Sequence, residues 1–192
     1  MTSCAQAIQN WEAKTGQKAV KAKEIKLCAQ QPPLSKMDKT FANLQECETL
    51  SLSTNAIDRI GSLAGMSKLK ILSLGRNNIK KIEKLEEVSS TLEQLWISYN
   101  QVSSLDGVAC CTNLTTLFMS NNQIKSFSDL DALATLDNLK EVLFIGNPMY
   151  DESADKDEAR LRVLARLPQL MKIDGHLIKP SDIEAMKQFI DE

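Results

Sequence analysis

The stretch LKILSLGRNNIKKI, residues 69–82, decides the fold. It follows the pattern L-x-x-L-x-L-x-x-N-x-I-x-x-I, and four other segments of the chain follow the same pattern in whole or in large part. The copies begin at residues 47, 69, 92, 114 and 139, so successive starts lie 22, 23, 22 and 25 residues apart. Self-similarity at a fixed period of this length indicates a repeat architecture, in which each copy is one structural unit.

Two apolar positions of each copy, the fourth and the sixth, lie on the same side of a short strand because side chains alternate. We expect them to face the core. The ninth position is Asn in every copy. An amide side chain both donates and accepts hydrogen bonds, so stacked amides can satisfy the buried backbone of the turns. The pattern therefore predicts a structural ladder, and no ligand site, at Asn55, Asn77, Asn100, Asn122 and Asn147.

The segments between the predicted strands keep apolar residues three apart, which indicates short helices or 3₁₀ turns. The fourth copy carries three extra residues near 129–136, which predict a longer α-helix there. Over about residues 47–150, the pattern resembles the short, 22-residue class of leucine-rich repeats. The resemblance implies an α/β fold: a right-handed solenoid with a parallel sheet on one face, short helices on the other, and helical caps at both ends.

The ends of a solenoid expose apolar edges, so capping segments are expected. Residues 1–46 are predicted as a helical N-terminal cap, with one helix ending at Gly16 and a second amphipathic helix from Ala22 to Ala29. Residues 47–150 form the repeats, and residues 151–178 a C-terminal cap. Residues 179–192 are predicted as a terminal helix that either packs on the body or projects from it. All four segments are assigned to one structural domain.

The open face of the predicted sheet carries an unusual row of side chains. The fifth position of each copy points to this face, and the residues there are Ser51, Ser73, Trp96, Phe118 and Leu143. Adjacent strands lie about 4.8 Å apart, so the last three should form a continuous apolar row. A contiguous exposed apolar patch usually marks an interface, and Trp, Tyr and Arg are enriched at binding hot spots. We therefore predict partner-binding residues on this face at Trp96, Phe118, Leu143, Ile145, Tyr99, Arg76 and Ile71.

Two alternatives to this interpretation stay open. The terminal segments could fold over the apolar row and cover it. The terminal helix could itself supply a second contact through Met186 and Phe189, although a stripe at helical spacing also fits a helix docked on its own core.

Composition and motifs argue against other classes of function. The chain has 192 residues and a net charge of −2, so it lacks the basic excess that binds phosphate backbones or anionic membranes. It has no apolar run of about 18 to 20 residues and no signal-peptide pattern, so we expect a soluble cytoplasmic protein. A single His176 and five cysteines without C-x-x-C spacing make a zinc site improbable. We expect no catalytic residues, no metal and no cofactor.

Nearly the whole chain is similar to the leucine-rich-repeat light chains of axonemal outer-arm dynein. The segments that carry the resemblance are NWEAKTGQ (10–17), AKEIKLCAQ (22–30), LSLSTNAI (50–57), ILSLGRNNIKKI (71–82), LEQLWISYN (92–100) and MSNNQIK (119–125). The resemblance implies a non-catalytic, regulatory, monomeric subunit in the axoneme of cilia or flagella. It also implies binding to the motor region of a dynein heavy chain near its microtubule-binding end, and contact with tubulin as a further partner.

Two other functions fit the repeat pattern. A regulatory repeat protein of a protein phosphatase would be expected to have a longer array than five copies. An adaptor in an RNA-processing complex would be expected to have a basic surface or tail, whereas this chain ends in Ile190-Asp191-Glu192.

Overall fold

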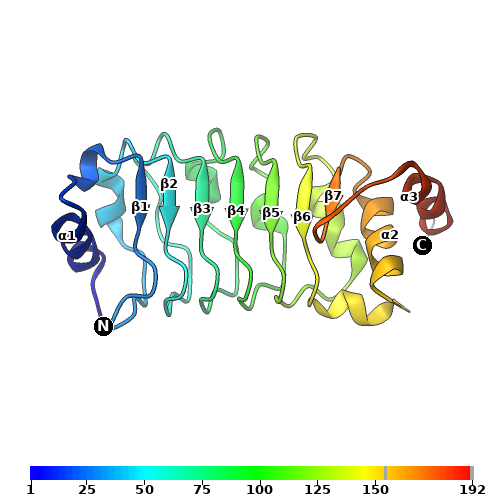
Figure 1. The fold of residues 1–192 in the computed structure, drawn as a ribbon, viewed down its shortest axis with the longest axis horizontal. Coiled ribbons are helices and arrows are strands. Elements are labelled where there is room, and N and C mark those ends of the chain that lie inside the picture. Colours follow the sequence, from blue (N-terminus) through cyan, green and yellow to red (C-terminus); the bar gives the residue numbers. More distant parts are fainter. Residues whose placement is uncertain (154, 191–192) are drawn as a thin grey trace.

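The computed structural model describes residues 1–153 and 155–190 as an elongated stack of coils (Figure 1). One eight-stranded sheet runs through the stack, and its strands lie side by side in sequence order. All neighbours are parallel except the last pair, which is antiparallel. The strands are β1 (Glu24–Lys26), β2 (Thr49–Ser51), β3 (Ile71–Ser73), β4 (Gln94–Trp96), β5 (Thr116–Phe118), β6 (Glu141–Leu143), β7 (Lys172–Ile173) and β8 (His176–Leu177).

Short 3₁₀ helices return the chain behind the sheet, and the expected α/β solenoid of leucine-rich repeats is confirmed (Figure 1). They are η1 (Ala19–Lys21), η2 (Lys39–Asn43), η3 (Leu85–Glu87), η4 (Asp106–Val108), η5 (Phe127–Leu133) and η6 (Pro148–Glu152). The prediction of an α-helix in the fourth copy was wrong, since η5 is a longer 3₁₀ helix. Its buried residues Phe127, Leu130 and Leu133 are three apart, and a 3₁₀ helix aligns that spacing on one side.

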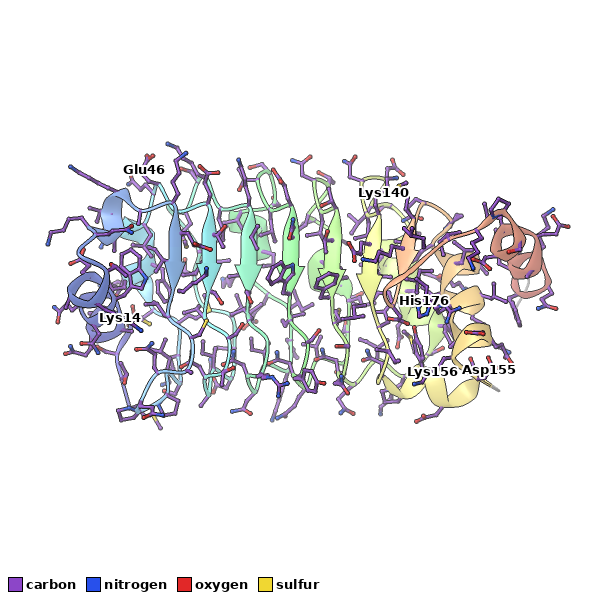
Figure 2. All side chains as sticks on the ribbon, in the orientation of Figure 1. Lys14, Glu46, Lys140, Asp155, Lys156 and His176 are labelled. Atoms are coloured by element: carbon purple, nitrogen blue, oxygen red, sulfur yellow. The ribbon has the colours of Figure 1, made fainter. Side chains whose placement is uncertain are left out.

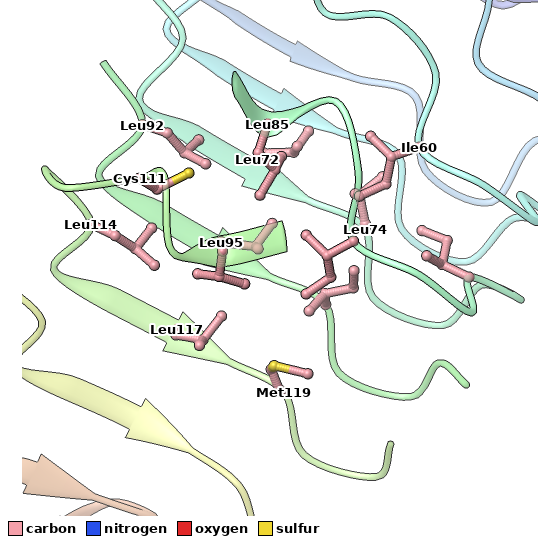
Figure 3. Close-up of a cluster of buried hydrophobic side chains, with 14 of the residues drawn as sticks. Ile60, Leu72, Leu74, Leu85, Leu92, Leu95, Cys111, Leu114, Leu117 and Met119 are labelled. Atoms are coloured by element: carbon pink, nitrogen blue, oxygen red, sulfur yellow. The ribbon is translucent and has the colours of Figure 1, made fainter. Parts of the chain in front are cut away.

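The core lies between the strands and the 3₁₀ helices (Figure 3). The fourth and sixth positions of the repeats, such as Leu95 and Ile97, are fully buried, as are outer-side residues such as Leu85. Every coil adds the same kind of apolar layer to one continuous core. Each coil therefore buries its apolar surface mainly against its neighbours, as expected of a solenoid.

The five ninth-position asparagines form the same hydrogen bonds in successive coils. The Asn100 amide donates to the carbonyls of Ile97 (3.0 Å) and Leu74 (3.0 Å), and its Oδ1 accepts from the Ile79 N–H (2.9 Å). Asn55, Asn77, Asn122 and Asn147 repeat this arrangement. These side chains pair backbone groups that would otherwise be unsatisfied between coils.

The N-terminal segment contains an additional coil that the sequence analysis missed. A helix was predicted from Ala22 to Ala29, but this segment holds β1, which pairs with β2 in parallel. The reason is that Ile25 and Leu27 occupy the fourth and sixth positions of a coil, and both are fully buried. The predicted first helix is present as α1 (Cys4–Thr15) and ends at Gly16, which has a φ of 71°.

The C-terminal segment closes the other end of the core with α2 (Lys156–Arg166). The Asp155 carboxylate begins this helix by accepting from the Asp157 and Glu158 N–H groups, each at 2.9 Å. The terminal segment, α3 (Pro180–Ala185) followed by η7 (Met186–Phe189), packs against α2. Of the predicted terminal helix, residues 191–192 lie outside the described residues.

Candidate protein-binding face

The strand register brings the predicted apolar row together on the open face. Trp96 lies directly opposite Phe118, and Phe118 lies opposite Leu143. The Trp96 and Phe118 rings are stacked, with centroids 5.9 Å apart and planes inclined by 24°. Trp96 is 39% exposed, whereas Phe118, Leu143 and Ile145 are half-buried. We call these four residues the open-face patch; none of the described helices covers this side of the sheet (Figure 1).

Arg76 and Tyr99 lie in the turns that follow strands β3 and β4. Both occupy the eighth position of their coils and have left-handed backbone conformations, with φ values of 55° and 58°. The Arg76 guanidinium lies over the Tyr99 ring, 4.4 Å from its centroid. Both side chains are exposed, so the pair presents to solvent a cation stacked on an aromatic ring.

The other predicted contact residues are not part of this patch. Ile71 is half-buried on β3 and lies opposite Gln94, in the row next to Trp96. Met186 packs against the core, and the Phe189 ring lies 5.0 Å from the Arg162 guanidinium of α2. Both terminal-helix residues therefore take part in docking their own segment.

One exposed apolar residue of the sheet was missed by the sequence analysis. Leu177 on β8 is 68% exposed and lies opposite Lys172. It belongs to a hairpin whose two-residue turn is Asp174-Gly175, with φ values of 50° and 82°. Asp-Gly is a strong sequence signal for this tight turn, so the dipeptide could have predicted the hairpin.

Charged side chains gather along the edge where the strands begin, away from the open-face patch (Figure 2). The Glu46 carboxylate forms an ion pair with the Lys68 ammonium group at 2.7 Å. Glu48 interacts with Lys70 at 3.0 Å and Lys23 at 3.2 Å, and these hydrogen bonds and charges lower the pKa of its carboxyl. A groove of about 590 Å³ follows this edge and is lined by such polar residues. Neighbouring coils are thus also linked by surface ion pairs.

Residues 1–153 and 155–190 contain no cluster of three or more His, Cys, Asp or Glu side chains that could hold a metal ion. Burial raises the pKa of Cys4 and Cys47 to about 11 and that of Cys111 to about 12, which suppresses the reactive thiolate. The hydroxyl of the half-buried Tyr150 donates to the Asp174 carboxylate, which itself accepts from two N–H groups of the last full repeat. This contact fastens the C-terminal hairpin.

Among the described residues, the helices are too short or too polar to span a bilayer.

Solved structures with this fold include the SNF/U2A′ complex of Drosophila melanogaster. The matching chain is 21% identical with a TM-score of 0.67, and the match covers 83% of this chain and 94% of that one. Internalin C2 of Listeria monocytogenes is 34% identical with a TM-score of 0.56, over 69% of this chain and 53% of that one. These likenesses support the fold.

Sequence relatives identify the family. Residues 90–132 match the family described as leucine-rich repeats (2 copies). Dynein axonemal light chain 1 of Chlamydomonas reinhardtii is 45% identical over 97% of this chain and 94% of that protein. The protein of the same name in Homo sapiens is also 45% identical, over 95% of this chain and 96% of its own length. The chain therefore belongs to the axonemal dynein light chain 1 family of leucine-rich-repeat proteins.

Proposed function

We propose that this chain is a non-catalytic regulatory light chain of ciliary or flagellar outer-arm dynein, and that it binds the heavy-chain motor region through the open-face patch. The proposal places the contact near the microtubule-binding end of the motor, with tubulin as a further partner. It places the protein in the cytoplasm and in the axoneme, as a monomeric subunit of a larger complex.

The observation that carries the proposal is the exposed aromatic stack on the sheet. A parallel sheet is usually covered on both faces, but the stacked Trp96 and Phe118 rings lie on the uncovered one. Leu143 continues the row in the next strand, and the stacked Arg76 and Tyr99 side chains are exposed in the turns after β3 and β4. Aromatic residues and Arg concentrate binding energy when a partner removes them from water. The names of the relatives supply the class of partner.

A pull-down from a detergent-free axonemal extract tests the proposal, with the purified chain as bait and mass spectrometry as readout. We expect the bait to recover an outer-arm dynein heavy chain, and Trp96→Asp to lose it because a buried unpaired charge opposes association. The matched control is Thr135→Asp, which puts the same charge on an exposed residue between η5 and β6. The circular dichroism spectra of both variants should remain native.

Recovery of the heavy chain by Trp96→Asp at wild-type levels would move the binding site away from the open-face patch. Recovery of a phosphatase catalytic subunit or of spliceosomal proteins, without dynein, would replace the proposed function. The likeness to the U2A′ complex extends to the fold alone and does not favour an RNA-processing role.

A further inference from the structure

The position of the Arg76 guanidinium is set by an aromatic ring and, among the described residues, not by an ion pair. Its guanidinium is stacked 4.4 Å from the centroid of the Tyr99 ring. Within residues 1–153 and 155–190, no carboxylate lies at ion-pair distance from it. A guanidinium whose planar face is occupied by an aromatic ring keeps its N–H edge available for a carboxylate, which it can bind through two parallel hydrogen bonds.

The backbone beneath this pair is left-handed. Residues with a side chain rarely adopt a positive φ, yet Arg76 and Tyr99 do so at 55° and 58°. The same position in the last full repeat is Gly146, with a φ of 81°, so a glycine meets the geometric requirement of the coil. Ala29, Thr54 and Asn121 have the same left-handed conformation at the eighth position of their coils, so this backbone geometry belongs to the coil and places the Arg76 and Tyr99 side chains at equivalent positions of adjacent coils.

The two ends of the open-face patch differ in charge. At the Leu143 end, Glu141 on β6 and Lys172 on β7 neutralise each other through a 2.8 Å ion pair. At the Trp96 end, Arg76 contributes a positive charge that no carboxylate of the described residues neutralises through an ion pair. A partner with one negative charge is therefore attracted to the Trp96 end, which fixes the direction in which an elongated partner lies.

The spacing of the apolar row matches one face of a helix. Strands are about 4.8 Å apart, so the row from Trp96 to Leu143 spans about 10 Å. Helix residues at i, i+4 and i+7 lie on one face, and i to i+7 spans about 10.5 Å. A helix laid across the strands can thus place one apolar side chain at each of Trp96, Phe118 and Leu143.

We infer that the open-face patch receives an amphipathic helix of the dynein heavy chain, and that Arg76 selects a carboxylate located one turn beyond the apolar stripe of that helix, at the Trp96 end. The inference rests on the proposed function and names the chemistry of its partner. Arg76 is a specificity residue in this scheme, and Tyr99 positions it.

The test compares Arg76→Gln with Lys125→Gln, which removes an exposed cation elsewhere on the surface. Each variant is titrated against the outer-arm heavy chain in axonemal extract at low and at raised ionic strength. We expect Arg76→Gln to weaken binding by about tenfold or more and to flatten the dependence on salt, because a charge-assisted contact is lost. Lys125→Gln should match the wild type. Wild-type affinity and salt dependence in Arg76→Gln, with binding still lost in Trp96→Asp, would overturn the inference and leave the proposed function standing.

A second measurement identifies the carboxylate directly. In the Arg76→Lys variant, the new amine can be joined to a nearby carboxylate with a water-soluble carbodiimide. The amide forms with loss of water, which the carbodiimide takes up as a urea. We expect a cross-link specific to this variant, on an acidic residue next to an i, i+4, i+7 apolar stripe of the heavy chain. A cross-linked segment without that stripe would overturn the helical partner. Failure of the wild-type chain to recover any dynein heavy chain would overturn both proposals.

Discussion

Leu95 and Trp96 are neighbours on strand β4, but they face opposite sides of the sheet. Leu95 is fully buried in the core, whereas Trp96 is 39% exposed on the open face. The inward side repeats nearly the same residue types in every coil. At the fifth position of the coils, the outward side changes from serine in β2 and β3 to large apolar residues in β4, β5 and β6. The inward side therefore specifies the fold, and the outward side is free to specify a partner. Substitutions on the two sides should have separable effects.

The largest effect on stability is expected from Leu95→Ala. Truncating a fully buried Leu removes apolar contacts and leaves a cavity, which costs about 2–5 kcal/mol. Urea denaturation followed by circular dichroism measures the change in the free energy of unfolding. A loss below about 1 kcal/mol would show that the coils can collapse around the gap, contrary to the close packing expected of a core.

Asn100→Ala should follow, because it leaves two carbonyls and one N–H of the buried backbone without their partner. We expect a loss of about 2–3 kcal/mol, since buried unsatisfied groups cost about 1–3 kcal/mol each and water replaces part of the lost bonding. Asn55→Ala is the matched control. Asn55 makes equivalent bonds but is only half-buried, so the same urea experiment should give a smaller loss. Equal losses would mean that burial does not set the strength of the ladder.

Trp96→Ser should destabilise the fold less than either of these core substitutions. Its main described contact on the open face is the stack with Phe118, and such aromatic pairs contribute about 0.5–1.5 kcal/mol beyond their buried area. We therefore expect the free energy of unfolding to fall by about 1–2 kcal/mol, measured in the same urea series. A loss as large as that of Leu95→Ala would contradict the division between the two sides of the sheet.

The smallest effect is expected from Thr54→Gly, and it has the opposite sign. Thr54 has a φ of 58°, which is unfavourable for a β-branched residue. Relief of that strain should slightly exceed the entropic cost of glycine, giving a gain of about 0.5 kcal/mol in a thermal or urea melt. The reverse control is Gly146→Ala, where an added Cβ would come within 2.6 Å of the Asn121 side chain and should destabilise. A destabilised Thr54→Gly would show that the threonine makes a compensating contact.

The repeats, and with them the apolar row, could be predicted because each copy carries both its apolar pattern and its asparagine. Once the register is known, alternation places Trp96, Phe118 and Leu143 in line, and the structure has them in that register. The N-terminal coil could not be found in the same way. It has Ala22 at the first position and Gln30 at the ninth, so it matches the repeat only at Ile25 and Leu27.

Other features depend on contacts that the sequence pattern does not contain. The stacking of Arg76 on Tyr99 requires left-handed turns in two adjacent coils. The residue types at these positions do not predict that conformation. The docking of the terminal segment depends on Arg162, whose guanidinium lies 5.7 Å from the Phe127 ring and 5.0 Å from the Phe189 ring. The division of the chain into caps, repeats and terminal helix stays a prediction, as do the contact residues.

The asparagine ladder also gives the chain a direction of assembly. Apart from the bond within its own coil, each amide bonds to the coil that precedes it: Asn77 to Leu52 and Ile57, and Asn100 to Leu74 and Ile79. During synthesis, the backbone partners of each asparagine have therefore left the ribosome before the asparagine itself. The asparagine of a nascent coil can therefore bond to the preceding coil without waiting for any later one. This order allows the ladder to be added from the N-terminus as the chain is translated, one asparagine at a time.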